Sequence, residues 1–424
     1  MEIKGAPVYI GKITGHDSKD ACFSYAENYK SNPDNRPVSL SLPLEEGTFS
    51  PEGTENYFEG LLPEGFTRKC VAQRLHADEE DYLSILSALG KECLGAIKIV
   101  EEGADETAPE YRPLSSREVK NLAREGATES ASIVAKSHLS LTGASGKVGL
   151  YYDEPNKQWY LPIGDAPSTH IVKQSHIRLS RIVTNEQLCL LTAKHLGINI
   201  PNSFILDLSG INKKPDEGDV LFATKRFDRV FLHPGRQLNG LPVPFRLHQE
   251  NFAQALGIAA ADKYEKNDED YMTKIFRLLR LCSANPLEDQ NRLWDLCVFN
   301  YLIGNTDNHI KNLSLLYSTS LKSIRLAPAY DLISTVIYDS SSEDMAFGIG
   351  GEINLSSISR KSFEEAARKA GLGVRMAMNR FDTLAAHLED ALNLASRTLE
   401  TQGFEEAERI REEIMNRGGI RSVC

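Results

Sequence analysis

Three features that would assign this protein to a special class are missing from its 424-residue sequence. No apolar run approaches the roughly 18 uncharged residues that a membrane helix needs. The seven cysteines are scattered and form no CxxC pair, so we expect neither a structural zinc site nor a disulfide framework. The start, MEIKGAPVYIGKI, lacks the apolar core and cleavage site of a signal peptide. These absences favour a soluble protein of the reducing cytoplasm, without membrane contact.

Positive charge is also in short supply. The chain has 48 Lys and Arg against 59 Asp and Glu, which gives a net charge of −11. Such a surface is not a nucleic-acid footprint, and we recognise no helix-turn-helix, so contact with DNA would require a partner. The two tryptophans, Trp159 and Trp294, are best interpreted as core residues.

Length and hydrophobic pattern predict three regions. Residues 1–130 combine short strand patterns with helical ones. Residues 131–245 are rich in strand patterns, and residues 246–424 are mostly helical in their spacing. The expected fold is α+β, with a β-rich N-terminal subdomain and nucleotide lobe before a large, all-helical C-terminal lobe. Two capping-box signatures predict helix starts, namely Ser115 with Glu118 and Ser362 with Glu365.

An unusually polar segment follows the apolar run LWDLCVFNYLI. GNTDNHIKN, residues 304–312, carries Asp307 and Asn312 five positions apart. Protein kinases use this spacing for a catalytic aspartate and a magnesium-binding asparagine. Lys311 or His309 could neutralise charge that develops on a transferred phosphoryl group. The alternative is a polar turn, because Asn, Asp and Gly favour turns for their own reasons.

Further acidic and basic residues flank this segment in the order of a kinase. LAPAYDLIS places Asp331 between hydrophobic neighbours, where a carboxylate that faces a divalent cation is less costly than a buried unpaired one. STHIVKQ places Lys173 on a predicted strand, and Glu186 follows early in a predicted helix. A strand lysine on the nucleotide phosphates, steadied by a helix glutamate, is the kinase arrangement. Each residue taken singly could be a turn cap or an exposed charge.

A run of small residues, LTGASGKVGL, joins two strand patterns upstream. Backbone amides of such a loop can approach phosphates. The loop is not a Walker A motif, because Leu141 stands where its first glycine should be and Val148 follows Lys147. The loop more closely resembles the hairpin that covers the nucleotide phosphates in protein kinases. A plain β-turn is the alternative. The candidate nucleotide-binding residues here are Thr142, Gly143, Ala144, Ser145 and Gly146.

Taken together, these strings resemble the HipA-type serine/threonine kinases, the toxin half of bacterial type II toxin–antitoxin pairs. The resemblance is carried, in family order, by FEGLLPEG, LGKECLGAIKI, LSLTGASGKVGL, STHIVKQ, NEQLCLLTAKHLGINIP, KRFDR, LHQENFAQALG, YLIGNTDNHIKNLSLLY and LAPAYDLIST. It implies a two-lobed, kinase-like fold across essentially the whole chain. It also implies ATP and Mg²⁺ as cofactors.

The resemblance assigns roles by position. Asp307 would be the catalytic base, and Asn312 and Asp331 would hold magnesium. Lys173 would contact the ATP phosphates, with Glu186 as its partner.

Two further assignments follow from the resemblance alone. Residues Arg226, Phe227 and Asp228 of KRFDR would lie near the adenine and ribose, with packing alone as the alternative for Phe227. Ser140 stands where HipA-like kinases carry an autophosphorylated serine. The usual GAQ-x-K loop is GASGK here, so Ser145 offers a second phosphorylation site.

The leading functional hypothesis is therefore an ATP- and magnesium-dependent serine/threonine protein kinase, the toxin of a toxin–antitoxin pair, which also autophosphorylates. Glutamyl-tRNA synthetase is the first candidate substrate. A helix-turn-helix antitoxin is the expected partner, and DNA is contacted only through it. The alternative is a catalytically weak regulatory protein that acts as a co-repressor with that antitoxin. A small-molecule kinase is a third possibility, against which the N-terminal 130 residues weigh.

Overall fold

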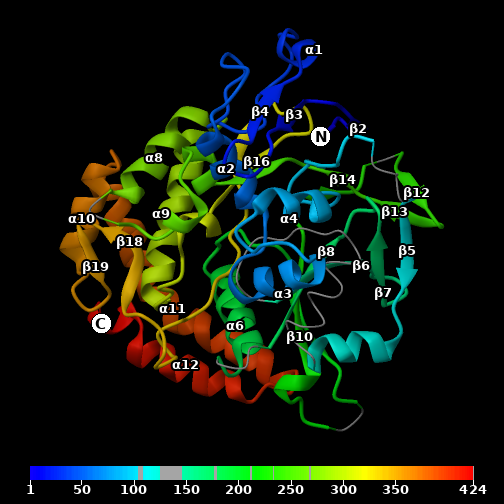
Figure 1. The fold of residues 1–424 in the computed structure, drawn as a ribbon. Coiled ribbons are helices and arrows are strands. Elements are labelled where there is room, and N and C mark those ends of the chain that lie inside the picture. Colours follow the sequence, from blue (N-terminus) through cyan, green and yellow to red (C-terminus); the bar gives the residue numbers. More distant parts are fainter. Residues whose placement is uncertain are drawn as a thin grey trace. The chain divides into compact units, whose positions relative to one another are not determined.

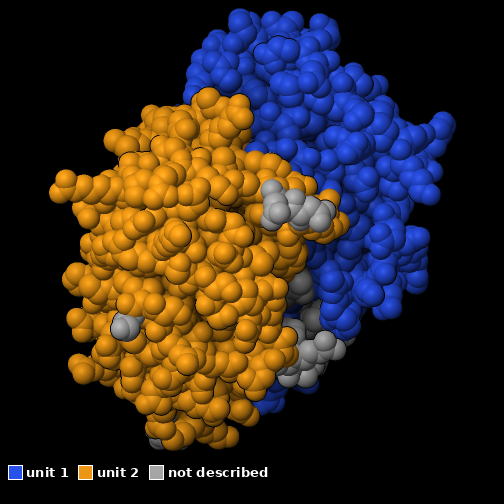
Figure 2. Space-filling view, turned by 90° about the vertical axis from the view of Figure 1, so that its left-hand side faces the viewer, with its two compact units in different colours: residues 1–176, 218–260, 316–323 blue, residues 177–217, 261–315, 324–424 orange. Residues whose placement is uncertain are grey.

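The computed structural model of this chain describes residues 1–103, 108–124, 146–175, 179–210, 213–232, 234–266 and 269–423. Contacts group the chain into two compact units, coloured separately in Figure 2. The first unit comprises Met1–His176, Gly218–Ala260 and Leu316–Ser323. The second comprises Ile177–Glu217, Ala261–Leu315 and Ile324–Cys424.

The N-terminal part of the first unit is built from two hairpins and short helices. The hairpins are β1 (Glu2–Ile3) with β2 (Ala6–Pro7) and β3 (Gly11–Thr14) with β4 (Cys22–Tyr25). The helices are α1 (Glu27–Lys30), α2 (Pro51–Phe58), α3 (Gly65–Leu75) and α4 (Tyr82–Leu89). Helix α2 begins where Ser50 accepts a hydrogen bond from the Gly53 amide, with proline at the first helical position. Aromatic rings, such as the stacked pair Phe23 and Phe49, fill the core of this part.

An antiparallel sheet forms the rest of the first unit's framework. Its strands are β5 (Glu110–Pro113), β6 (Lys147–Asp153), β7 (Gln158–Ile163), β8 (His170–Gln174) and β10 (Val220–Lys225). Within this unit the order is β5-β7-β6-β8-β10, so β8 has β6 on one side and β10 on the other. Nearly every residue of β6 and β10 is buried, as expected for strands that are covered on both faces.

Short elements complete the first unit. They are β11 (Arg229–Val230), β12 (Arg236–Leu238), β13 (Leu241–Val243), β14 (Phe245–Arg246), β15 (Gln249–Asn251) and α7 (Phe252–Leu256). Helix α7 has a capping box between Asn251 and Gln254, and it ends at Gly257 in the left-handed region.

Helices dominate the second unit. They are α6 (Ile182–His195), α8 (Tyr271–Cys282), α9 (Pro286–Ile303), α10 (Arg360–Lys369), α11 (Val374–Thr401) and α12 (Glu406–Arg417). Helix α11 spans 28 residues and packs against α6, α9, α10 and α12 (Figure 1). Trp294 on α9 is fully buried and donates its indole N–H to the Ala377 carbonyl oxygen at 2.9 Å. Among the described helices, none combines the length and apolarity required to cross a membrane.

Short strands and turns link these helices, so the prediction that residues 246–424 are all-helical is wrong, because the connections between helices pair as short strands. The strands are β9 (Ser203–Asp207), β16 (Ser314–Tyr317), β17 (Ile324–Leu326), β18 (Asp344–Ile349) and β19 (Glu352–Asn354), and β18 pairs with β19. A 3-10 turn, η4 (Ile310–Asn312), lies between α9 and β16.

Both predicted helix starts can be compared with the structure. The Ser115–Glu118 capping box is confirmed: the Glu118 carboxylate accepts from the Ser115 amide at 2.8 Å, and residues 116–124 are helical. The second prediction is wrong. Helix α10 begins earlier, with Ser359 as its N-cap and Ser362 in the third helical position. The predicted domain boundary near residue 130 lies outside the described residues.

Candidate active site

The polar segment 304–312 follows directly after helix α9. Asn285 caps the start of this helix, with Pro286 in the first helical position, and Gly304 ends it at φ 68°. A β-carbon at Gly304 would lie 2.3 Å from Cγ2 of Val336, closer than carbon atoms can approach. Glycine is therefore required here for both its backbone conformation and its lack of a side chain. The chain turns sharply at this point and the loop begins.

Buried polar contacts hold the first part of the loop. The Asn305 side chain is completely buried, and its amide nitrogen donates to Oδ1 of Asn300 at 2.7 Å. The Thr306 amide donates to the Thr335 hydroxyl at 2.7 Å, and that hydroxyl donates to the Gly304 carbonyl oxygen at 3.0 Å. Satisfied buried networks of this kind fix a single backbone conformation.

Within residues 304–312, all of which the structure describes, Asp307 alone is exposed and Asn312 is half-buried. The Asn312 side-chain nitrogen donates to the Asp307 backbone carbonyl oxygen at 3.0 Å. The His309 amide donates to the same carbonyl oxygen at 2.8 Å. The loop thus displays one carboxylate to solvent and ties the predicted metal-binding asparagine to the backbone of the same residue.

Asp331 is tethered to the same loop. Its backbone carbonyl oxygen accepts from the Asn305 amide nitrogen at 3.3 Å. The preceding residue, Tyr330, donates its hydroxyl to the Lys311 carbonyl oxygen at 3.1 Å. Asp331 has φ 54°, a left-handed conformation that costs a non-glycine residue on the order of 1 kcal/mol. The structure therefore brings Asp307, Asn312 and Asp331 together within the second unit, with backbone strain at the residue predicted to hold the metal.

His309 and Lys311 are placed differently from Asp307. Both side chains are buried, and the edge of the Tyr264 ring contacts the His309 ring at 5.3 Å between centroids. Because their side chains are buried, His309 and Lys311 help to hold the loop in its conformation. The predicted contact with a phosphoryl group stays a prediction.

Lys173 lies on β8 in the first unit. Its Nζ is 5.5 Å from the ring centroid of Phe222, which is its partner across the pairing with β10. On the other side, the register of β6 places Lys147 directly opposite Lys173. Directly paired residues of an antiparallel sheet share a face, and like charges in such a pair repel. The register therefore sends two lysine side chains out on the same face of the sheet, and we expect this face to suit an anion. Lys147 was not among the predicted site residues.

Several predicted residues cannot be compared in this way. Glu186 is buried on α6, which belongs to the second unit, so its predicted pairing with Lys173 stays a prediction. Gly146 directly precedes β6 and is buried. The other loop residues and the predicted phosphorylation site lie outside the described residues: Thr142, Gly143, Ala144, Ser145 and Ser140.

The KRFDR residues enter a buried ion network in the first unit. All five N–H groups of the Arg226 guanidinium have protein acceptors at 2.8–3.2 Å. These acceptors are oxygens of Asp228, Glu92, Ser168 and Cys93. The Asp228 carboxylate also accepts from the Gly95 amide and from Gln249, each at 2.8 Å. The contacts of Arg226 and Asp228 thus include the N-terminal segment around residues 92–95. Their predicted position beside adenine and ribose stays a prediction, and Phe227 is half-buried.

Glu92 is the centre of this network. Its carboxylate accepts from Arg226 at 3.1 Å, from Arg229 at 2.8 Å and from Arg246 at 2.7 Å. Burial alone would raise the pKa of Glu92, but the three arginines outweigh burial and lower the pKa to about 2. Asp228 has a depressed pKa for the same reason, with burial opposed by Arg226 and Arg229.

The chemistry of the donors fits a hard cation. Asn312 offers an amide oxygen and Asp331 a carboxylate, the ligand types that Mg²⁺ prefers. Among the described residues there is no cluster of three or more His, Cys, Asp or Glu able to hold a metal ion. A cation at this position would complete its coordination with phosphate oxygens and water, as Mg²⁺ commonly does in kinases.

Comparison with known proteins identifies the family. The HipA N-terminal domain family matches residues 3–100, and the HipA-like C-terminal domain family matches residues 139–406, more than half of the chain. The chain belongs to the HipA-like family.

Relatives of this HipA-like protein match along most of their length. The protein Y4mE of Sinorhizobium fredii is 30% identical over 392 residues, which cover 90% of this chain and 88% of the relative. The serine/threonine-protein kinase toxin HipA of Shewanella oneidensis is 28% identical over 387 residues, which cover 88% of this chain and 83% of the relative.

A solved structure confirms the predicted fold of the HipA-like chain. It contains HipA, HipB and operator DNA from Shewanella oneidensis. The match has a TM-score of 0.77 at 23% identity and covers 98% of this chain and 95% of that chain. The α+β, kinase-like architecture expected from the sequence is thereby established.

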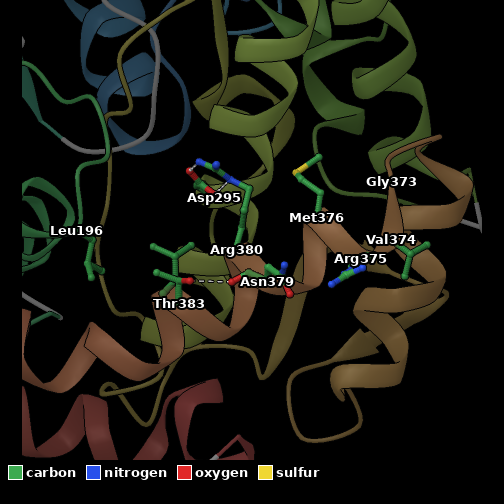
Figure 3. A pocket seen from close by; sticks show the side chains of 10 residues that line it. Leu196, Asp295, Gly373, Val374, Arg375, Met376, Asn379, Arg380 and Thr383 are labelled. Carbon is green, nitrogen blue, oxygen red and sulfur yellow. Dashed lines mark hydrogen bonds and ion pairs between the residues drawn. The ribbon is translucent and has the colours of Figure 1, made fainter.

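The HipA-like chain also has a separate surface pocket in its second unit, of about 700 Å³ (Figure 3). Leu196, Asp295 and the first turns of α11 line it. Nε of Arg380 donates to Oδ1 of Asp295 at 2.7 Å, so these two charges offset each other. The lining consists of residues other than those predicted to act in catalysis, and we assign the pocket no part in the chemistry.

Proposed function

We propose that this chain is an ATP- and magnesium-dependent kinase that phosphorylates a serine or threonine hydroxyl of a protein. The observation that carries the proposal is the loop 304–312, in which the Asp307 side chain is exposed while most of the other residues are buried. Asn312 binds the backbone of Asp307, and Asn305 joins the loop to Asp331. A phosphoryl-transfer site needs this combination of one accessible base and oxygen ligands in fixed positions.

The residues would divide the work as follows. Bound Mg·ATP supplies the phosphoryl group and the cation that offsets phosphate charge. Asp307 accepts the proton of the acceptor hydroxyl and orients its oxygen. The Asn312 amide oxygen and the Asp331 carboxylate hold the cation. The hydrogen bond from the Asn312 nitrogen to the Asp307 carbonyl oxygen holds the proposed base and the proposed cation ligand in a fixed relative position.

The nucleotide phosphates would be held by the first unit. Lys173 is the predicted contact, and its strand partner Lys147 adds a second positive charge on the same face. We include Glu186 as the partner of Lys173, and residues 142–146 as the loop over the phosphates. Phe227 is the member of KRFDR that we place beside the adenine.

Partners follow from the family. The Shewanella oneidensis structure contains HipA with HipB and operator DNA. By analogy, we propose that this chain binds a helix-turn-helix antitoxin, which alone contacts DNA. An aminoacyl-tRNA synthetase, with glutamyl-tRNA synthetase first, is the candidate substrate class. Autophosphorylation at Ser140 or Ser145 would limit activity.

A transfer assay tests the proposal directly. Full-length protein is incubated with magnesium and γ-labelled ATP, alone and with dephosphorylated casein as a generic acceptor. Wild type should label itself or casein, and Asp307→Asn should reduce the rate by roughly 10²–10⁴. Asp17→Asn, an exposed carboxylate outside the loop, is the matched control and should retain the wild-type rate. Equal labelling by wild type and Asp307→Asn would exclude this base.

A binding measurement separates the kinase from a catalytically silent co-repressor. Millimolar Mg·ATP should raise the thermal unfolding temperature of wild type, because a ligand that binds the folded state stabilises it. Asp331→Asn should reduce that shift when magnesium is present. No shift for wild type at any nucleotide concentration would favour the co-repressor.

A further inference from the structure

A tyrosine outside all the motif strings contacts the proposed base. The Tyr264 hydroxyl donates to Oδ1 of Asp307 at 2.5 Å. Both residues belong to the second unit, but they are 43 positions apart in sequence. A hydrogen bond to an ionised carboxylate is short and roughly twice as strong as a neutral one.

The backbone on both sides of Tyr264 is held in place. The Asp262 carbonyl oxygen accepts from the Tyr271 hydroxyl at 2.7 Å. The Glu265 amide donates to the Ala346 carbonyl oxygen at 2.8 Å. The Glu265 carboxylate accepts from backbone amides at the start of α8 and on β18, those of Asp270, Tyr271 and Gly348, at 3.1–3.2 Å. Tyr264 therefore projects from a braced segment.

Its ring is oriented as well. The ring lies edge-on to His309 at 82° and 5.3 Å, and Nζ of Lys263 lies 5.3 Å from its centroid. His309 is buried in the same loop that carries Asp307, so the ring rests on the loop whose carboxylate it contacts. Two contacts from one side chain, one to His309 and one to Asp307, define its position.

We propose that Tyr264 is a positioning residue that orients the Asp307 carboxylate toward the acceptor hydroxyl. This inference rests on the proposed function and adds a residue to that site. An exposed aspartate on a loop can rotate about its side-chain bonds, and each wrong rotamer removes the base from the reacting oxygen. A donor on a braced segment selects one rotamer before the substrate arrives, which is how active sites reduce the entropic cost of reaction.

The kinetic test uses Tyr264→Phe, which keeps the ring against His309 and removes only the hydroxyl. With casein and labelled Mg·ATP, we expect kcat to fall about tenfold and KM for ATP to stay within twofold. Tyr9→Phe, at an exposed tyrosine of the first unit, is the matched control and should keep the wild-type kcat. An unchanged kcat in Tyr264→Phe overturns the proposal. So does an increase in kcat/KM for casein, because it would mean that the tyrosine blocks the acceptor position.

A second measurement does not depend on activity. In protein labelled with ¹³C at aspartate carboxyl carbons, the signal absent from Asp307→Asn identifies Asp307. At a single pH, the carboxyl chemical shift of Asp307 should differ between wild type and Tyr264→Phe, because the carboxyl carbon senses the hydrogen bond to its oxygen. Tyr9→Phe is the control and should keep the wild-type signal. An Asp307 signal at the same position in Tyr264→Phe and wild type overturns the proposal.

The two experiments distinguish the failure of this inference from the failure of the proposed function. If wild type transfers no more phosphate than Asp307→Asn, the kinase is excluded, while the change in the Asp307 carboxyl signal still reports the contact. If wild type is active and Tyr264→Phe is equally active with an unchanged carboxyl signal, the kinase stands and the positioning role is excluded.

Discussion

Asn305 donates from its side-chain nitrogen to the backbone carbonyl oxygen of Asp331 at 3.3 Å. The side-chain oxygen of the same asparagine accepts from the Asp307 amide at 3.3 Å. One completely buried side chain thus contacts the residue proposed as base and a residue proposed to hold the cation. Because both contacts are to backbone atoms, Asn305 sets where the two segments lie and takes no part in the chemistry itself.

Replacing Asn305 with alanine should therefore affect both stability and transfer. Asn305→Ala leaves the Asp307 amide and Asn300 without their partner, which should lower the free energy of unfolding by about 1–3 kcal/mol. The transfer rate should fall more than tenfold at temperatures where the variant is still folded. Urea unfolding and the casein assay measure the two effects. Asn379→Ala, at an exposed position of α11, should change neither.

Lys147 should matter for nucleotide binding about as much as Lys173. Replacement of either lysine with methionine removes one of two positive charges on the same face of the sheet, so we expect each to weaken Mg·ATP binding about tenfold. Titration calorimetry measures the dissociation constants. The exposed strand residue Lys12, changed to methionine, is the control. Wild-type affinity in Lys147→Met would remove that lysine from the site.

Glu92→Gln should destabilise the first unit and change its response to acid. Loss of this carboxylate leaves buried arginines without their shared partner, at a cost of about 3–5 kcal/mol. The pKa of Glu92 is about 2 in the folded chain against 4.5 ordinarily. Its stabilisation is therefore complete above pH 4.5 and is lost as the pH falls toward 2. Denaturant unfolding followed by circular dichroism should show a steeper acid loss in wild type than in Glu92→Gln. Parallel curves would contradict the assignment.

Glu250 should give the opposite pH dependence. Its carboxylate accepts from the Ser39 hydroxyl at 2.5 Å, from the Leu40 amide at 3.2 Å and from the Tyr317 hydroxyl. Burial raises the pKa of Glu250 to about 7, against the lowering effect of these hydrogen bonds. The folded state then holds a proton that the unfolded state releases near pH 4.5, so stability falls as the pH rises from 4.5 to 7.

Glu250→Gln should remove that fall, because glutamine stays neutral and can still accept hydrogen bonds. The variant should be more stable than wild type at pH 8, by roughly 1–3 kcal/mol, and similar to it at pH 5. Unfolding curves recorded from pH 5 to 8 test this. A variant less stable than wild type across the range would show that the carboxylate is ionised in the folded chain.

Gly304→Ala should distort the start of the loop 304–312. The substitution combines strain at φ 68° with a clash against Val336, and we expect a loss of more than about 2 kcal/mol in unfolding free energy. Val336→Ala in the same chain should restore part of that loss by removing the clash. Gly197→Ala, at φ 79° with no atom within 4 Å among those described, measures the strain alone. Equal losses at the two glycines would show that Val336 gives way freely.

Local spacing accounts for what the sequence predicted well. The five-residue separation of Asp307 and Asn312 spans a single loop, so its geometry follows from short-range rules. The Ser115–Glu118 cap is equally local. The Ser362 prediction failed because two serines three positions apart both suit a helix start, and Ser359 is the one that caps it.

Contacts that depend on distant pairing were not predicted. Lys147 gains its significance only from the register that sets it opposite Lys173. Glu92 and Arg226 are 134 positions apart, and nothing near either one indicates the other. Tyr264 stands outside every motif, and its contact with Asp307 depends on how α8 and β18 brace its segment. Periodicity and spacing carry no information about such contacts.

The sharing of Glu92 by three arginines restricts how this chain can change during evolution. A substitution at Glu92 leaves several buried positive charges without their shared partner, and no single replacement elsewhere compensates for all of them. Loss of one arginine upsets the balance that the others and Asp228 require. We therefore expect a substitution at one of these positions to need compensation at the others before the chain regains its stability. The segment around residues 92–95 and the arginines that share Glu92 should tolerate substitution together better than separately.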